Sequence, residues 1–237
     1  MKLSAPIYHL KRSAKRLARE EGIELHVALD RIASGEGFKS WSLLATKYQS
    51  SSSASKLYAG LKNGDMMLIG ARPAQGKTLL ALEIAVEAVK SGKRGMFFTL
   101  EYTEGEVLER LSSLGIEPSR LGAGFEFDCS DGICADHIIS KARSAPTGTV
   151  IVIDYLQLLD QKREHPPLAE QVEALKSFAE KSGVAVVFIS QIARSYDPSG
   201  KRSPDLSDVR LPNPLDLALF TKTHFLSNGP AHMSAAS

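Results

Sequence analysis

The sequence predicts an α/β protein in which a mainly parallel sheet carries helices on both faces, preceded by a small all-α module. After residue 55, short apolar runs alternate with amphipathic segments, as in repeated strand–helix–strand units. The runs at 149–154 and 184–190 are almost continuously apolar and β-branched, which is typical of strands buried on both faces. The distribution of charge also indicates two parts. The first 60 residues hold ten Lys or Arg and five Asp or Glu. Of the totals of 29 and 27, this leaves 19 basic and 22 acidic residues for the rest of the chain, so the first part is basic and the second slightly acidic.

Three helices are expected in the N-terminal part. Apolar residues recur at helical spacing from Leu10 to Ala18, and five Lys or Arg residues occupy other positions between 11 and 19. A second helix is expected around Leu25–Ile32, and Ser40 is placed to cap a third. The basic residues of the first helix would contact nucleic-acid phosphates or form a solvated face, and both interpretations stay open.

The chain is expected to divide where four consecutive serines, 50–53, follow each other without an apolar anchor. Beyond them, most of the expected strands are short apolar runs, and apolar residues at helical spacing mark the expected helices. The division predicts a basic helical module at 1–48, a linker at 49–55 and an α/β domain at 56–237. In that domain the expected strands are 65–70, 95–100, 125–128, 149–154 and 184–190, and the expected helices are 76–91, 104–114, 135–143 and 168–182.

Composition excludes several classes of protein. Apolar residues make up 43% and charged residues 24% of the chain, which is ordinary for a globular protein. No apolar run approaches the length of a membrane span, and residues 1–8 lack an apolar signal core, so a cytoplasmic protein is expected. Two cysteines and six scattered histidines make neither a disulfide framework nor a cluster of metal ligands.

The segment from Leu68 to Thr78 places a loop between an expected strand and an expected helix, which is the context that a phosphate-binding loop (P-loop) requires. Backbone N–H groups of such a loop bind phosphate oxygens, and Gly76 lets the backbone approach them closely. Lys77 is placed to reach the β- and γ-phosphates, and the Thr78 hydroxyl to ligate Mg²⁺. The usual pattern has Gly where this chain has Ala71. The expected ATP-binding residues are Ala71, Arg72, Pro73, Ala74, Gln75, Gly76, Lys77 and Thr78.

Three residues at the ends of other strands are expected to complete the site. Asp154 ends an apolar strand and is the second expected Mg²⁺ ligand besides Thr78. Glu101 ends another strand and is expected to polarise the attacking water, the alternative being that it caps a helix near Thr103. Gln191 follows a third strand, and its amide is able to sense the γ-phosphate. Because ligands bind at the carboxyl ends of parallel strands in open α/β sheets, the expected catalytic residues are Glu101, Lys77 and Gln191.

Four segments carry a resemblance to a known family. They are 70–78 (GARPAQGKT), 154–158 (DYLQL), 189–194 (ISQIAR) and 204–210 (PDLSDVR), and their order is that of DnaB-type replicative helicases. The chain resembles the C-terminal domain of that family over about residues 55–220, and the family also accepts Ala at the first loop position. The resemblance implies a RecA-like fold, a catalytic role for Glu101, and ATP hydrolysis coupled to nucleic acid in a ring of subunits. The implied nucleic-acid contacts are Arg194, Lys201 and Arg202.

The C-terminal part departs from those helicases. The family places an arginine finger just before an Asn-Gly-Pro-like turn; the turn is kept at 228–230, but residues 225–227 carry no cation. The nearest basic residue, Lys222, does not match the motif position. Because such an arginine raises the rate by about 10³–10⁵ in related hydrolases, its absence predicts slow turnover or no ring assembly. Two prolines also stand in 211–216, where the family has an acidic stretch.

Two functions follow from these observations. The first is a DnaB-like ATPase that binds and hydrolyses ATP with Mg²⁺ on or near DNA. The alternative is a nucleotide-gated interaction protein, whereas a small-molecule kinase is disfavoured because no acceptor-binding motif is present. The expected partners are ATP, single-stranded DNA and a protein that contacts residues 1–48, with no membrane. The tail after Pro230 is small and polar and is expected to be loosely ordered.

Overall fold

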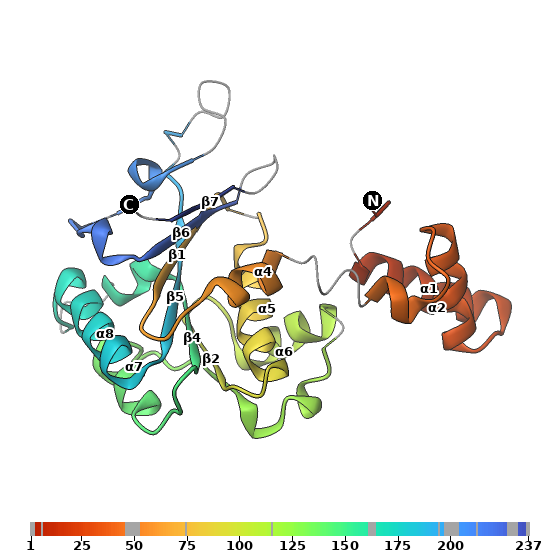
Figure 1. The fold of residues 1–237 in the computed structure, drawn as a ribbon, viewed down its shortest axis with the longest axis horizontal. Coiled ribbons are helices and arrows are strands. Elements are labelled where there is room, and N and C mark those ends of the chain that lie inside the picture. The colour runs from red at the N-terminus through yellow and green to blue at the C-terminus, as the bar shows by residue number, and fades with distance from the viewer. Residues whose placement is uncertain are drawn as a thin grey trace.

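A seven-stranded sheet lies at the centre of the computed structural model (Figure 1). Its strand order is β3-β2-β4-β5-β1-β6-β7. Neighbouring strands are parallel, except that β7 is antiparallel to β6. The strands are β1 (Met66–Ala71), β2 (Gly95–Thr99), β3 (Phe125–Asp128), β4 (Val150–Asp154), β5 (Ala185–Gln191), β6 (Lys222–Phe225) and β7 (His232–Ala235).

Seven α-helices have defined bounds in the part of the chain that the structure describes. That part consists of residues 3–5, 7–45, 53–73, 75–114, 116–160, 165–193, 195–196, 204–211, 213–226 and 232–235. The helices are α1 (Ile7–Glu21), α2 (Leu25–Gly35), α4 (Ser53–Gly60), α5 (Lys77–Lys90), α6 (Glu104–Ser113), α7 (Ala135–Ala142) and α8 (Leu168–Ser182). Short 3₁₀ turns lie at Pro118–Arg120, Gly122–Gly124, Leu156–Asp160, Leu206–Asp208 and Leu217–Leu219. None of these described helices is both long and apolar enough to cross a membrane.

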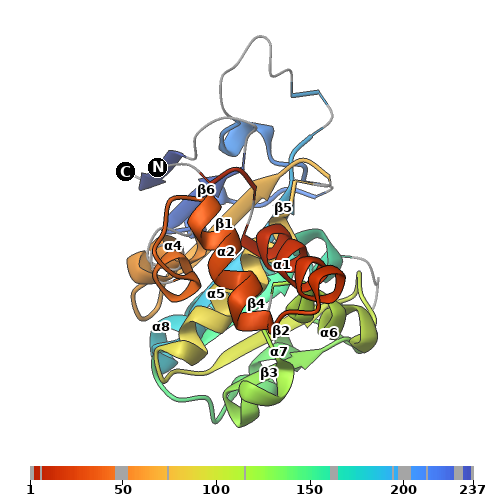
Figure 2. The same ribbon diagram turned by 90° about the vertical axis from the view of Figure 1, so that its right-hand side faces the viewer.

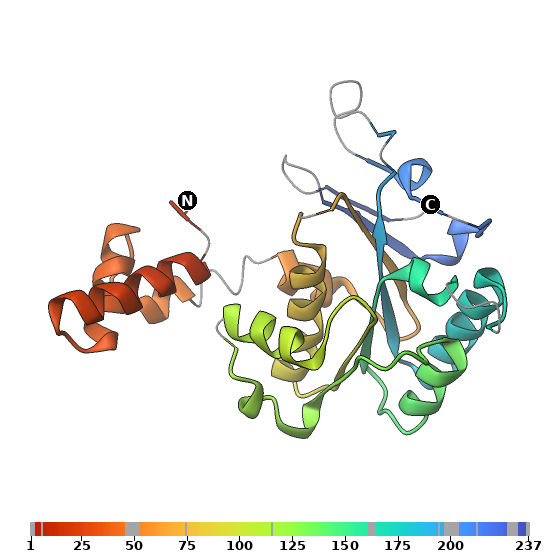
Figure 3. The same cartoon turned by 180° about the vertical axis from the view of Figure 1, so that it is seen from behind.

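The central strands β1, β2, β4 and β5 are buried on both faces of the sheet because their alternate residues belong to two different cores. On one face, Met67 and Ile69 of β1 share a core with apolar residues of α4, α5 and α6. On the other face, Met66 and Leu68 share a core with residues of α7 and α8. Figures 1 and 3 show these two groups of helices on opposite sides of the sheet. The predicted fold class is confirmed, and the long β-branched runs are indeed doubly buried strands.

Helices α1 and α2 pack side by side at the N-terminal end (Figure 2). Their small core is made of Leu10, Ala33 and Leu44, with Leu3, Ala5, Ile7, Ile32, Phe38 and Trp41 packed against it. Residues 41–45 are helical, and the Ser40 hydroxyl accepts the N–H of Leu43 at 3.4 Å, in line with the expected cap. The division of the chain at 49–55 remains a prediction; α4 begins at Ser53, inside the expected linker.

Three elements have no counterpart among the sequence predictions: α4, β6 and β7. Strand β6 contains one large apolar residue, Phe225, so neither alternation nor an apolar run marks it, yet it pairs along β1. Strand β7 lies in the tail that was expected to be loosely ordered, and it pairs with β6. This pairing does not depend on an apolar run, so no pattern in the sequence marks β7.

Candidate nucleotide-binding site

The loop between β1 and α5 has the backbone conformation expected of a phosphate-binding loop. Gly76 precedes the helix with φ +80°, a conformation that L side chains rarely adopt. The Arg72 N–H donates to Oε1 of Gln75 at 2.9 Å, which closes the turn before the helix. A Cβ added at Gly76 would meet no atom within 4 Å, so the space beside the loop is open. Of the expected loop residues, Ala74 lies outside the described part of the chain.

Lys77 and Glu101 face each other across this loop. Lys77 is the first residue of α5, and its Nζ lies 3.8 Å from Oε2 of Glu101, which follows β2. The Lys77 side chain is only 10% exposed, whereas that of Glu101 is 27% exposed. Nζ also lies 6.0 Å from the ring centroid of Tyr155, at the distance of a weak cation–π contact. The structure thus brings together two of the three expected catalytic residues.

Asp154 is the most buried charged group of the site. It ends β4 beside Thr99 of β2 and is fully buried, and neither of its carboxylate oxygens has a hydrogen-bond partner among the described residues. Burial raises the pKa of Asp154 to about 6; Glu101 adds to this rise, and the Thr78 hydroxyl and Lys77 oppose it. A buried carboxylate without a partner is unfavourable unless a cation neutralises it. The residues present therefore fit a divalent cation beside Asp154 and Thr78.

The alternative role for Glu101, as a helix cap, is taken by other residues. Helix α6 begins at Glu104, and its capping residue is Thr103. The Thr103 hydroxyl accepts the N–H of Glu106 at 3.4 Å, and the Glu106 carboxylate accepts the N–H of Thr103 at 2.8 Å. Glu101 is left facing Lys77, with its own N–H bonded to the Thr99 hydroxyl at 3.1 Å.

The structure joins all four segments that carry the family resemblance. Gln191 lies at the end of β5 beside Ala71, and its carbonyl accepts the N–H of Arg210 at 2.8 Å. The Gln157 side chain donates to Oγ of Ser190 at 2.9 Å and also to the carbonyl of Arg210. The ends of β4 and β5 and the segment 204–210 are therefore tied into one layer above the carboxyl edge of the sheet.

Sequence reasoning missed the aromatic residues of the site. The Tyr102 hydroxyl lies 3.5 Å from that of Thr78, and the guanidinium of Arg110 stacks 3.6 Å from the centroid of the Tyr102 ring. The one available signal was position, since Tyr102 and Tyr155 each directly follow an expected site acid. The expected nucleic-acid contacts Arg194, Lys201 and Arg202 lie outside the described residues and stay predictions.

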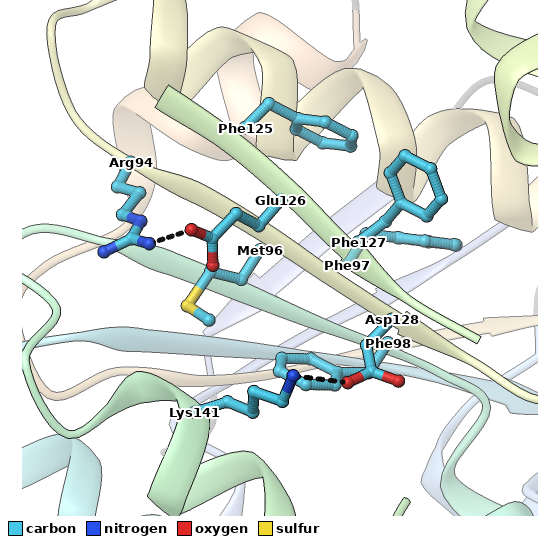
Figure 4. A pocket seen from close by; sticks show the side chains of 9 residues that line it. All are labelled: Arg94, Met96, Phe97, Phe98, Phe125, Glu126, Phe127, Asp128 and Lys141. Carbon is cyan, nitrogen blue, oxygen red and sulfur yellow. Dashed lines mark hydrogen bonds and ion pairs between the residues drawn. The ribbon is translucent and has the colours of Figure 1, made fainter. Parts of the chain in front are cut away.

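A cavity of about 500 Å³ lies elsewhere, at the outer strand β3 (Figure 4). Figure 4 shows two ion pairs across it, Arg94 with Glu126, and Lys141 with Asp128 at 3.5 Å. Desolvation opposes a low pKa for Asp128, but hydrogen bonds from Ser130 and His137 outweigh it and lower that pKa. The cavity shares no residue with the P-loop, so it is not part of the nucleotide site.

Three features define a P-loop nucleotide-binding domain. The sheet is mainly parallel, Lys77 and Thr78 begin the helix that follows the β1–α5 loop, and a buried acid ends β4. The family model described as the DnaB-like helicase C terminal domain matches residues 46–124 and 122–213, more than half of the chain. The chain therefore belongs to this family, whose helicases are ATP-hydrolysing enzymes, and the resemblance seen in the sequence is confirmed.

Two relatives are 29% and 26% identical to the chain over the aligned residues. A probable plasmid replicative DNA helicase of Chlamydia muridarum is 29% identical over 197 residues, covering 70% of this chain and 43% of that protein. The replicative DNA helicase DnaB of Geobacillus stearothermophilus is 26% identical over 187 residues, covering 65% and 41%. The chain thus spans about two fifths of the length of these curated relatives.

Two solved structures share the fold. A DnaB-like replicative helicase, solved in a study of its interactions with primase, matches with a TM-score of 0.60 at 20% identity, over 92% of this chain and 66% of that chain. A solved ATPase domain matches with the same TM-score and identity, over 81% of this chain and 92% of that chain. The fold is therefore RecA-like, as the resemblance implied.

Proposed function

We propose that this chain binds ATP with Mg²⁺ at the β1–α5 loop and hydrolyses it on or near DNA. The observation that carries the proposal is Asp154, a fully buried acid with no partner among the described residues, at the end of β4 next to the P-loop helix. Above the raised pKa of this acid, a bound cation would neutralise the buried charge. DNA is included in the proposal because the relatives named above are replicative DNA helicases.

Each residue has a distinct part in the proposed reaction. Lys77 and the backbone N–H groups of the loop hold the β- and γ-phosphates, and Thr78 and Asp154 hold the cation. Glu101 orients and polarises the attacking water, and Gln191 contacts the γ-phosphate from the end of β5. When bound, Mg²⁺ supplies charge neutralisation on the phosphate oxygens. The 3.8 Å approach of Lys77 to Glu101 supports this reading, since both groups would meet the terminal phosphate.

The first experiment is steady-state ATP hydrolysis by the full chain across a titration of single-stranded DNA, with Lys77→Ala as the blank. Stimulation by DNA above that blank is the expected result. Triple substitution of Arg194, Lys201 and Arg202 by Ala should remove the stimulation and leave the rate without DNA unchanged. No ATP binding by the full chain, measured by calorimetry, would overturn the proposal.

Turnover is proposed to be slow. The family's finger position precedes the Asn-Gly-Pro turn, and no cation stands at 225–227 of this chain. Without trans stabilisation, related hydrolases run about 10³–10⁵ times more slowly. Duplex unwinding is consequently not part of the proposal.

The second candidate is a nucleotide-gated interaction protein, in which ATP holds a conformation that a protein partner reads through residues 1–48. The missing cation at 225–227 and the separate core of α1 and α2 favour it. A hydrolysis rate that stays flat with DNA while ATP is bound would support it. Limited proteolysis should then cut first within the proposed linker at 49–55, with a rate that depends on ATP.

A further inference from the structure

Helix α1 has one face in the core and another in solvent. Leu10 and Ala14 are buried, at 7% and 0% exposure, where α1 packs on α2. The outer face carries four exposed cations at spacings of three, one and three residues, so they lie along one stripe of the helix. This basic stripe consists of Arg12, Lys15, Arg16 and Arg19.

The charge of the basic stripe is not neutralised within the module. Arg12, Lys15 and Arg19 have no carboxylate partner among the residues that the structure describes, and Arg16 has one weak, exposed contact with Glu20 at 3.8 Å. Most other acids of the module are engaged elsewhere. Glu21 pairs with Arg31, Glu36 accepts from Ser4, Asp30 accepts the N–H of Trp41, and Glu24 pairs with His26.

The composition of the stripe distinguishes among polyanionic partners. Protein interfaces have an apolar centre depleted in lysine, whereas nucleic-acid interfaces are polar and strongly positive. No apolar residue stands within the stripe, and the exposed leucines of the module, Leu25 and Leu43, lie on other elements. Insertion into a membrane would need the apolar face of α1, which Leu10 and Ala14 keep in the core.

We propose that the basic stripe of α1 binds the phosphate backbone of DNA without sequence preference, and that this binding does not require ATP. From Arg12 to Arg19 the stripe extends about 10 Å along the helix axis, a length over which duplex DNA presents roughly six negative charges. This second contact lies outside the ATPase domain and is distinct from Arg194, Lys201 and Arg202. The choice of DNA over RNA rests on the proposed function.

The test measures binding of a fluorescently labelled 25-base-pair duplex of mixed sequence to the full chain, by anisotropy, without ATP and over a range of salt concentrations. The test variant replaces Arg12, Lys15, Arg16 and Arg19 by Gln. The matched control replaces four other exposed cations by Gln, namely Lys62, Lys93, Arg143 and Lys181. These four precede strands β1, β2, β4 and β5, at the edge of the sheet opposite the P-loop, so the control loses the same net charge elsewhere.

The stripe variant is expected to bind at least about tenfold more weakly at low salt. The slope of log K against log salt should be reduced by about 3.6, because each of the four phosphate contacts contributes about 0.9. The control should retain the wild-type slope within about 1. Equal losses in both variants, or an unchanged stripe variant, would overturn the proposal. Competition by polyglutamate as strong as that by duplex DNA would also overturn it and assign the stripe to acidic proteins. Circular dichroism confirms that both variants fold.

The proposed function and this inference can fail independently of each other. The Lys77→Ala variant should bind the duplex as wild type does, because the stripe needs no nucleotide. A chain that hydrolyses no ATP but shows the stripe-dependent slope would keep this inference and lose the proposed function. If DNA stimulates hydrolysis but the stripe contributes nothing to DNA binding, the proposed function is kept and this inference is lost.

Discussion

Nζ of Lys77 lies 3.8 Å from Oε2 of Glu101, so the cation expected on the phosphates and the acid expected on the attacking water form an ion pair across the mouth of the loop. The two come from different elements, the start of α5 and the end of β2, which are held together by the core between helix and sheet. Their roles in binding and in chemistry are separable by substitution, which leads to the first prediction.

Replacing Glu101 by Gln should leave ATP binding intact and lower the hydrolysis rate about 10²–10⁴-fold, because the amide cannot accept the proton of the attacking water. Lys77→Ala, in contrast, should abolish binding itself. Calorimetric titration with ATP and steady-state phosphate release measure the two effects. A Glu101→Gln variant that turns over at the wild-type rate would remove Glu101 from the mechanism.

Asp154 should make the protein without Mg²⁺ less stable as the pH rises. Its pKa is about 6 in the folded chain, above the ordinary value of 3.8, so the folded state holds the proton more tightly than the unfolded state. Stability is full below about pH 4 and is lost as the pH rises through 6, by about 3 kcal/mol. Asp154→Asn should therefore gain up to this amount at pH 7.5 in urea unfolding, and lose the stabilisation that Mg²⁺ and ATP give the wild type.

Asp128 supplies the matched control for that prediction, because its pKa is shifted in the opposite direction. Hydrogen bonds from Ser130 and His137 lower the pKa of Asp128 in spite of partial burial. Its contribution to stability is present above the ordinary pKa and is lost as the pH falls. Asp128→Asn should therefore destabilise the protein at pH 7.5. A gain in both variants would show that loss of net negative charge, rather than burial of Asp154, is responsible.

The sequence was sufficient where periodicity and position carry the information. Strands β1, β2, β4 and β5 are apolar runs, and Asp154 and Glu101 stand at the ends of two of them, so their meeting at one sheet edge follows from parallel topology. Strand β6 could not be found in this way, because its pairing with β1 is a backbone contact between distant segments. The contact between Tyr102 and Thr78 likewise joins the segment after β2 to the first turn of α5 and has no sequence period.

Glu83 predicts a second loss of stability with rising pH. Burial on α5 raises its pKa to about 7, an effect that Lys90 opposes and Glu87 strengthens. Because the folded pKa exceeds the ordinary value of 4.5, stability is full below about pH 4.5 and falls as the pH passes 7. Glu83→Gln should raise the urea midpoint at pH 8.5 and leave it unchanged at pH 4. An equal gain at both pH values would point to helix propensity instead of ionisation.

Gly70 should tolerate no side chain, because β1 runs under a phenyl ring just before the P-loop. A Cβ at this position would lie 2.6 Å from two ring carbons of Phe225 and 3.0 Å from Cδ1 of Ile192. Both neighbours are buried, at 6% and 2% exposure, and β6 is held to β1 in register, so the ring has little room to move. Overpacking of this kind costs typically about 1–3 kcal/mol.

The Gly70→Ala variant should accordingly unfold at lower urea concentration and bind ATP more weakly. Shortening the obstructing ring in the double variant Gly70→Ala/Phe225→Leu should recover part of the loss, whereas Phe225→Leu alone leaves a cavity and is itself destabilising. The contradicting result is a double variant whose loss of unfolding free energy exceeds the sum of the losses of the two single variants. Something other than the phenyl ring would then require glycine at position 70, and the contact between β1 and β6 would not explain that requirement.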